Sequence, residues 1–202
     1  MNASETHLGY TAIHFRSAAE LRKWLEKNHA TSAAVFAIMY RKESDVKSVY
    51  WDELVNEVIC FGWIDGKRTK RDQESFYQYI SPRNPKSHWS QINKAKVERL
   101  LSENKIAPAG LAMIELAKKT GTWNALDKID ALELPVELVT ALKKNKKASD
   151  YFYAFPPSAK KLILWWIMNA KRAETRQKRI DETVRLAEKN IRANPSLPKS
   201  QQ

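Results

Sequence analysis

Two cations and two hydroxyl groups lie around the expected start of a helix near residue 90: Arg83, Lys86, Ser87 and Ser90. A helix N-terminus carries free amide groups and a partial positive charge, which attract phosphate and carboxylate groups. The neighbouring cations and hydroxyls add further donors, so this segment suits an anionic ligand. The simpler interpretation is that the serines only cap the helix and that Arg83 pairs with Asp65 or a carbonyl group.

One carboxylate, Asp65, follows two large apolar residues and precedes Gly66 at the start of an expected strand. In such a position it can act as an acid or base, or it can orient Arg83. It can equally serve the fold as a turn acceptor or an ion-pair partner. We therefore expect an anion-binding groove near residues 63–66 and 83–90. Its expected ligand-binding residues are Trp63, Asp65, Arg83, Lys86, Ser87, Trp89, Ser90 and Asn93.

The residues that would support nucleophilic, metal or phosphate-loop chemistry are scattered or missing. The single cysteine, Cys60, excludes an intrachain disulfide. It falls on the polar side of its expected helix, away from any helix N-terminus that lowers a thiol pKa. The four histidines lack metal-ligand spacing, and none of the five glycines forms a phosphate-binding loop. We expect no metal, no cofactor and no catalytic residue, and an enzyme using Asp65, Arg83 and Ser87 is the alternative.

The formal net charge of +12 favours polyanionic partners such as nucleic acid, an anionic membrane surface or acidic ligands. Basic residues cluster at Lys67–Arg71, at Lys143–Lys147 and towards the end of the chain. With Tyr77 and Tyr79 they favour binding of RNA or single-stranded DNA through charge and stacking. A solvated basic surface is the competing interpretation, because no recognised RNA-binding motif is present. The candidate nucleic-acid residues are Lys67, Arg68, Lys70, Arg71, Arg172, Arg176 and Arg179.

Three strands in the first half of the chain are expected to position the candidate site. The apolar run Ala33–Arg41 predicts one strand, and Trp63–Thr69 with Ser75–Ile80 predicts a hairpin. Between them, Trp51–Phe61 has helical periodicity and ends at Gly62, which suits a positive φ. We expect a small three-stranded antiparallel sheet, supported by packed helices.

Helices are expected to fill the rest of the chain, which makes the fold class α+β with a larger, mainly helical C-terminal part. Their apolar faces predict that Trp24, Trp51, Trp89 and Trp165 lie mostly in the core. The sequence leaves open whether the helices before and after Ala173 are continuous. The expected organisation is a flexible arm at 1–12, an α+β domain at 13–121, a helical region at 122–192 and a disordered tail at 193–202.

Four blocks of residues resemble the bacterial YdeI or OmpD-associated family, also called bacteriocin-protection proteins. They are Phe15-Arg16-Ser17 with Glu20-Leu21 and Trp24-Leu25; Cys60-Phe61-Gly62-Trp63-Ile64-Asp65-Gly66; Ser81-Pro82-Arg83 with Ser87, Trp89-Ser90 and Asn93; and Ala170-Lys171-Arg172 with Glu174-Thr175-Arg176 and Arg179-Ile180. Their order and spacing match from about residue 13 to 190. The chain departs from the family pattern at Ala173, where the family has a proline that marks a helix start.

The resemblance implies a role in resistance to antimicrobial peptides or stress, with no established reaction. Residues 1–7 lack the basic and apolar regions of a secretory signal. The longest apolar run, Leu162–Met168, is far shorter than the roughly 20 residues of a membrane span. We therefore expect a cytoplasmic, non-enzymatic protein of this type that binds a small anionic ligand or polyanion. The alternatives are a nucleic-acid-binding module and the enzyme described above, and the sequence does not specify the oligomeric state.

Overall fold

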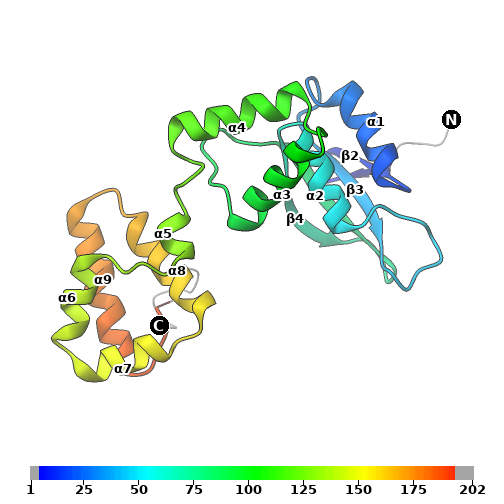
Figure 1. Ribbon diagram of the computed structural model, residues 1–202. Coiled ribbons are helices and arrows are strands. Elements are labelled where there is room, and N and C mark those ends of the chain that lie inside the picture. Colours follow the sequence, from blue (N-terminus) through cyan, green and yellow to red (C-terminus); the bar gives the residue numbers. More distant parts are fainter. Residues whose placement is uncertain (1–4, 194–202) are drawn as a thin grey trace. The chain divides into compact units, whose positions relative to one another are not determined.

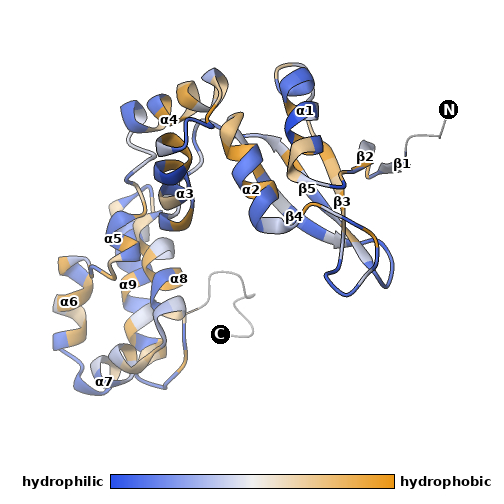
Figure 2. Cartoon of the chain, turned by 45° about the vertical axis from the view of Figure 1, so that its right-hand side comes forward, coloured by the Kyte–Doolittle hydropathy of each residue, from blue (hydrophilic) through white to orange (hydrophobic). Residues whose placement is uncertain are grey.

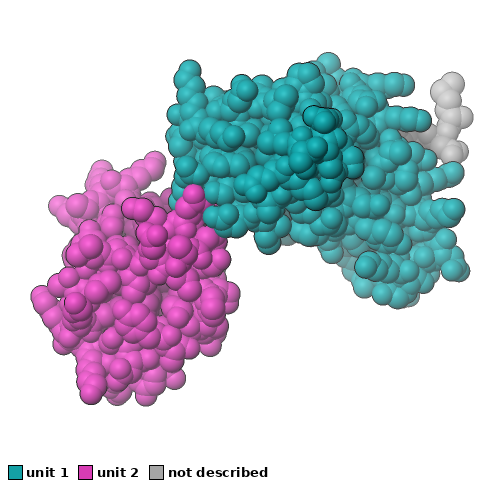
Figure 3. Space-filling model, viewed as in Figure 1, with its two compact units in different colours: residues 1–125 teal, residues 126–202 magenta. Residues whose placement is uncertain are grey.

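The computed structural model describes residues 5–193, and the chain divides into two compact units, Met1–Ala125 and Leu126–Gln202 (Figure 3). Unit 1 contains a sheet and the first four helices, and unit 2 is helical within its described residues (Figure 1). The tail predicted to be disordered falls, apart from Ala193, outside the described residues. None of the helices in residues 5–193 combines the length and the apolar character that a membrane crossing requires.

Five strands form one mixed sheet in unit 1, in the order β1-β2-β3-β5-β4. The pair β2 and β3 is parallel, and the other neighbouring pairs are antiparallel. The strands are β1 (Glu5–His7), β2 (Tyr10–His14), β3 (Val35–Tyr40), β4 (Trp63–Lys70) and β5 (Ser75–Pro82). The helices of this unit are α1 (Ala18–Asn28), α2 (Trp51–Cys60), α3 (Gln91–Ser102) and α4 (Pro108–Thr120).

The predicted three-stranded antiparallel sheet is wrong in the number of strands and in their directions. The three expected strands do form β3, β5 and β4, with the antiparallel pairing that was predicted. The sequence predicts a loose arm over residues 1–12, but residues 5–7 and 10–14 form β1 and β2. β1 has three residues and no apolar alternation, and its Glu5 is held by Arg71, 66 residues away. Such a pairing leaves no local signal.

The two faces of the sheet have different partners. On one face, Val35, Ala37 and Met39 of β3 pack with apolar residues of α1 and α2 in the main core of unit 1. Figure 2 shows β3 in the colours of hydrophobic residues. On the other face, Phe36 and Ile38 form a smaller cluster with tyrosines of β3 and β5. β3 is therefore apolar on both sides, which explains its unbroken run of hydrophobic residues.

Helices α2 and α4 approach each other closely through two glycines. Gly62 follows α2 with a positive φ of +71°, a conformation that disfavours other residues. A Cβ atom on Gly110 would lie 2.3 Å from the carbonyl oxygen of Cys60. The amide of Ala107 donates to that same carbonyl at 3.0 Å. The end of α2 and the start of α4 are thus in backbone contact.

Unit 2 packs its helices around one apolar core. The core includes Leu138, Phe152, Ile163, Leu164 and Ile180, all of them buried. The helices are α5 (Asp127–Asp130), α6 (Val136–Lys143), α7 (Lys146–Ala154), α8 (Pro157–Met168) and α9 (Ala173–Ala187). Helix α8 ends at Met168 and α9 begins at Ala173, so the last two helices are separate although the proline is missing.

The tryptophan prediction is correct at two positions and wrong at two. Trp89 is 1% exposed, and Trp24 is half-buried against the core of unit 1. Trp51 and Trp165 are 42% and 43% exposed. Trp51 is the first residue of α2, and the buried residues of this helix begin only at Leu54.

Candidate functional site

Arg83 is the central residue of the predicted site, and it is buried. It follows β5, and its side chain is 2% exposed. Its guanidinium carbon lies 3.7 Å from the centre of a Trp89 ring, and its Nη2 donates to the carbonyl oxygen of His88 at 2.7 Å. Stacking on tryptophan and one charge-assisted bond therefore fix the guanidinium within unit 1.

The remaining donors of Arg83 are unsatisfied. A guanidinium has five N–H groups. The one on Nε and the two on Nη1, three of the five, are enclosed and have no acceptor among residues 5–193. Burial lowers the pKa of Arg83 to about 10, and the negative charge of Asp65 partly offsets this effect. Since that pKa is well above 7, the guanidinium is ionised at neutral pH. A negatively charged partner would stabilise such an enclosed cation with unpaired donors.

Asp65 and Trp63 are placed by β4. Asp65 is half-buried, and one of its carboxylate oxygens accepts from Nε1 of Trp51 at 3.2 Å. No hydrogen bond to Arg83 is formed, so the predicted contact between them is electrostatic only. Trp63 is buried, and its Nε1 donates to the carbonyl oxygen of His29 at 3.1 Å. Trp63 therefore belongs to the core rather than to a ligand groove.

The segment before α3 uses its polar groups within the fold. Helix α3 starts at Gln91, and the Ser90 hydroxyl accepts from the amide of Asn93 at 3.3 Å, so Ser90 is the cap. Ser87 donates to the carbonyl oxygen of Asn84 at 2.7 Å, and Lys86 is exposed. The Ser87 hydroxyl is thus used within the loop that precedes α3.

Cys60 lies in the core, contrary to the prediction that it faces the polar side of its helix. It is 0% exposed because the start of α4 covers it. Burial, together with the charge of Glu57, raises the pKa of the Cys60 thiol. A protonated, enclosed thiol is a poor nucleophile.

The candidate nucleic-acid residues on β4 and its turn differ in what they contact. Arg71 donates to both carboxylate oxygens of Glu5, at 2.8 and 2.9 Å, and is therefore committed to the fold. Arg68, Lys67 and Lys70 are exposed. Tyr77 and Tyr79 lie on the sheet face away from the main core, where Tyr77 stacks on His7 with ring centres 4.0 Å apart.

The candidate arginines of α9 are used mainly within unit 2. Arg176 donates to Glu137 at 3.4 Å, and Arg179 donates to the carbonyl oxygen of Trp166 while packing over that ring. Arg172 is exposed at the start of the helix. The predicted arginine stripe is thus reduced to one exposed side chain.

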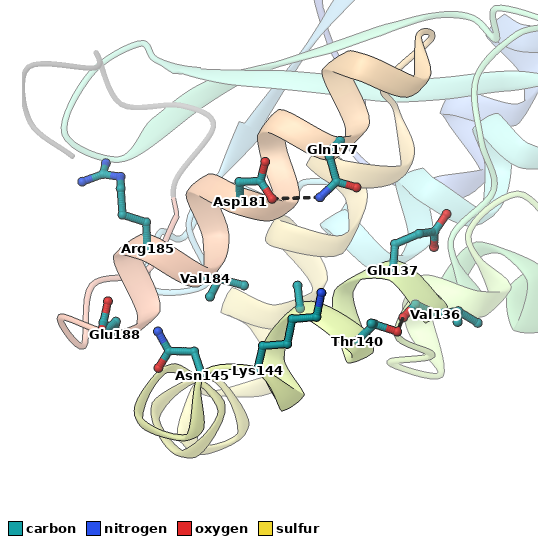
Figure 4. Close-up of a pocket in the computed structure, with 11 residues that line it drawn as sticks. Val136, Glu137, Thr140, Lys144, Asn145, Gln177, Asp181, Val184, Arg185 and Glu188 are labelled. Carbon is teal, nitrogen blue, oxygen red and sulfur yellow. Dashed lines mark hydrogen bonds between the residues drawn. The ribbon is translucent and has the colours of Figure 1, made fainter.

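A groove of about 660 Å³ lies between α6 and α9, and the sequence did not predict it. Figure 4 shows the lining residues, with Val136 and Thr140 on α6, Lys144 directly after α6, and Asp181 and Val184 on α9. Asp181 accepts from the side chain of Gln177 at 2.8 Å. Acidic and basic groups alternate along the groove, so its lining does not select a ligand of one charge. Packing of two helices creates it, and no local sequence pattern reports such a feature.

Two family models match the chain. The model described as "Domain of unknown function (DUF8412)" matches residues 13–113, and the model described as "Bacteriocin-protection, YdeI or OmpD-Associated" matches residues 131–190. No curated protein and no solved structure shows a significant match. The first match falls within unit 1 and the second within unit 2. The predicted family resemblance is confirmed over residues 131–190.

Proposed function

We propose that this chain, which belongs to the family described as "Domain of unknown function (DUF8412)" and matches the bacteriocin-protection, YdeI or OmpD-associated model over residues 131–190, protects a cell against a bacteriocin or similar peptide. In this proposal it acts in the cytoplasm, without catalysing a reaction, by binding an anionic ligand through unit 1. The ligand carries a carboxylate or a phosphate, and Arg83 is its main contact.

The burial of Arg83 carries this proposal. Three enclosed N–H groups without an acceptor each cost roughly 1–3 kcal/mol, and stacking on Trp89 returns only part of that cost. An anionic oxygen next to Nη1 or Nε satisfies them and supplies the opposite charge. Strained or unsatisfied groups of this kind are concentrated at functional sites.

The ligand reaches Arg83 only when residues 84–88 move, while Trp89 stays in the core of unit 1 and Ser90 stays at the cap of α3. The unpaired nitrogens have almost no exposed surface, and this segment between β5 and α3 has no regular secondary structure. Its hydrogen bonds are few: the Ser87 hydroxyl and amide both use the Asn84 carbonyl, and the Lys86 amide uses the Asn84 side chain. Opening therefore breaks little structure beyond the bond between Arg83 and His88.

The binding experiment compares wild type with Arg83→Met and Lys86→Gln. Methionine fills similar space without leaving an unpaired charge, so the variant should fold with its melting temperature changed by only a few degrees. Calorimetric titration with inorganic phosphate and citrate should detect binding by the wild type. The affinity of Arg83→Met should be at least about tenfold lower, and that of Lys86→Gln lower by about twofold or less. Equal binding by wild type and a folded Arg83→Met would exclude this site.

The cellular experiment measures survival of a bacteriocin-sensitive strain that expresses the wild-type chain or Arg83→Met. Protection by the wild type and loss with the variant is the expected result. Protection by both separates the family function from the Arg83 site, whereas no protection by the wild type contradicts the proposed function itself.

A further inference from the structure

A basic pocket lies beside the turn that joins β4 and β5. Its volume is about 340 Å³, and it is lined by Arg41, Arg68, Thr69, Lys70, Ser75 and Phe76. Three of these side chains are cations and none is a carboxylate. Cations that share a concave surface repel one another and raise the local positive potential, and a bound anion relieves this repulsion.

Arg68 is held in place for binding. Its guanidinium carbon lies 4.0 Å from the centre of the Phe76 ring, and its Nε donates to Gln78 at 3.4 Å. These contacts fix the plane of the guanidinium. The N–H groups of both terminal nitrogens remain available to a ligand, because neither nitrogen forms a hydrogen bond within residues 5–193. A planar group held flat on an aromatic ring loses little entropy when it binds a phosphate.

Arg41 and Lys70 supply two further positive charges. Both are exposed, and neither side chain forms an ion pair or hydrogen bond within the described part of the chain. The acids of the adjoining turn have other partners: Asp72 accepts from Arg71 and the Ser75 hydroxyl, and Glu74 accepts from the Ser44 hydroxyl. Asp72 is thus already paired with Arg71, and the single remaining carboxylate of the turn, Glu74, is outnumbered by the three cations of the pocket.

We infer that this pocket binds a phosphate ester that carries a nucleobase. The phosphate lies among Arg41, Lys70 and the free nitrogens of Arg68. The base stacks on the exposed side of the Arg68 plane, a contact that accepts any base. Either a free nucleotide or the backbone of a single-stranded nucleic acid carries this group. The site is separate from Arg83: Arg41 directly follows β3, and the other lining residues come from β4 and β5.

The test is a fluorescence titration of the full chain with a labelled eight-nucleotide single strand, with unlabelled nucleoside monophosphate and inorganic phosphate as competitors. Arg68→Lys keeps the charge but loses the planar fork, and it should weaken binding at least about tenfold. Lys70→Gln should weaken binding several-fold and lower the salt slope by about 1. Lys119→Gln, an exposed lysine of α4 in the same unit, is the matched control and should bind like wild type.

The competitors identify the source of the phosphate. A strand that binds far more tightly than the monophosphate indicates nucleic acid, and equal affinities indicate a single nucleotide; both results support the pocket. Loss in Lys119→Gln equal to that in Lys70→Gln would show diffuse charge attraction and overturn the inference. The absence of binding at low salt would also overturn the inference. Arg83→Met should leave this binding unchanged, which separates it from the proposed function.

Discussion

The contact between α2 and α4 makes Gly110→Ala a sharp test of the packing in unit 1. A methyl group at this position would lie 2.3 Å from the Cys60 oxygen, 2.8 Å from the Cys60 carbonyl carbon and 2.8 Å from Cγ2 of Ile106. Two of these atoms belong to backbone that Gly62 and the bond from Ala107 hold in place. Neither can move away as a flexible side chain would.

The expected cost follows from three terms. Overpacking against backbone destabilises by about 1–3 kcal/mol. Separating the helices weakens the bond from Ala107 to Cys60, worth about 1 kcal/mol. Replacing glycine by alanine inside a helix stabilises the helix by about 0.5–1 kcal/mol. The net expectation is a loss of about 2 kcal/mol, which lowers the melting temperature of a unit of this size by about 6–10 °C.

Urea and thermal unfolding of the full chain measure this change, with Ala112→Gly as the control. Ala112 is exposed on the same helix. Its replacement by glycine should therefore lower the unfolding free energy only by the difference in helix propensity, about 1 kcal/mol. Helix propensity alone predicts the opposite order, with Gly110→Ala more stable than wild type. That outcome would refute the close backbone contact.

Two further predictions concern titrating groups. Because burial raises the pKa of the Cys60 thiol, its reaction with a thiol reagent at pH 8 should be slow in the native protein and fast in urea, and rapid native labelling would contradict its enclosure. The hydrogen bond from Arg71 lowers the pKa of Glu5, so its contribution to stability is present above the ordinary value of 4.5 and is lost as the pH falls through the lower folded value. Glu5→Gln should therefore reduce the acid dependence of the unfolding free energy, and an unchanged pH profile would show that this pair adds nothing.

Much of the fold follows from local patterns, and the errors follow from distant contacts. Hydrophobic periodicity predicted β3, the hairpin and α2, because each signal lies within about ten residues. β1 and the start of β2 were missed although they pair with each other across Leu8-Gly9, because β1 carries no apolar residue, and their other contacts, with β3 and Arg71, are distant in the chain. Cys60 shares a helix face with polar residues, and its burial depends on tertiary packing that the periodicity of α2 does not report.

The candidate site was predictable in part for the same reason. The sequence identifies Arg83 and Trp89 as unusual neighbours, but it does not show that one ring lies flat against the other side chain. It also identifies Arg68 and Lys70 as a basic cluster. It gives no reason to connect them with Arg41, which pairing between β3 and β5 brings to the same end of the sheet.

The position of β4 gives its charges a second consequence. β4 is the last strand of the order β1-β2-β3-β5-β4, so one side of its backbone has no neighbouring strand. An open strand edge invites pairing with another copy of the chain, and charged side chains or a bulge oppose this association. β4 has both, with a register shift between Asp65 and Arg68 and exposed cations at Lys67, Arg68 and Lys70. Neutralising all three cations is therefore expected to make this edge more prone to pair with another strand.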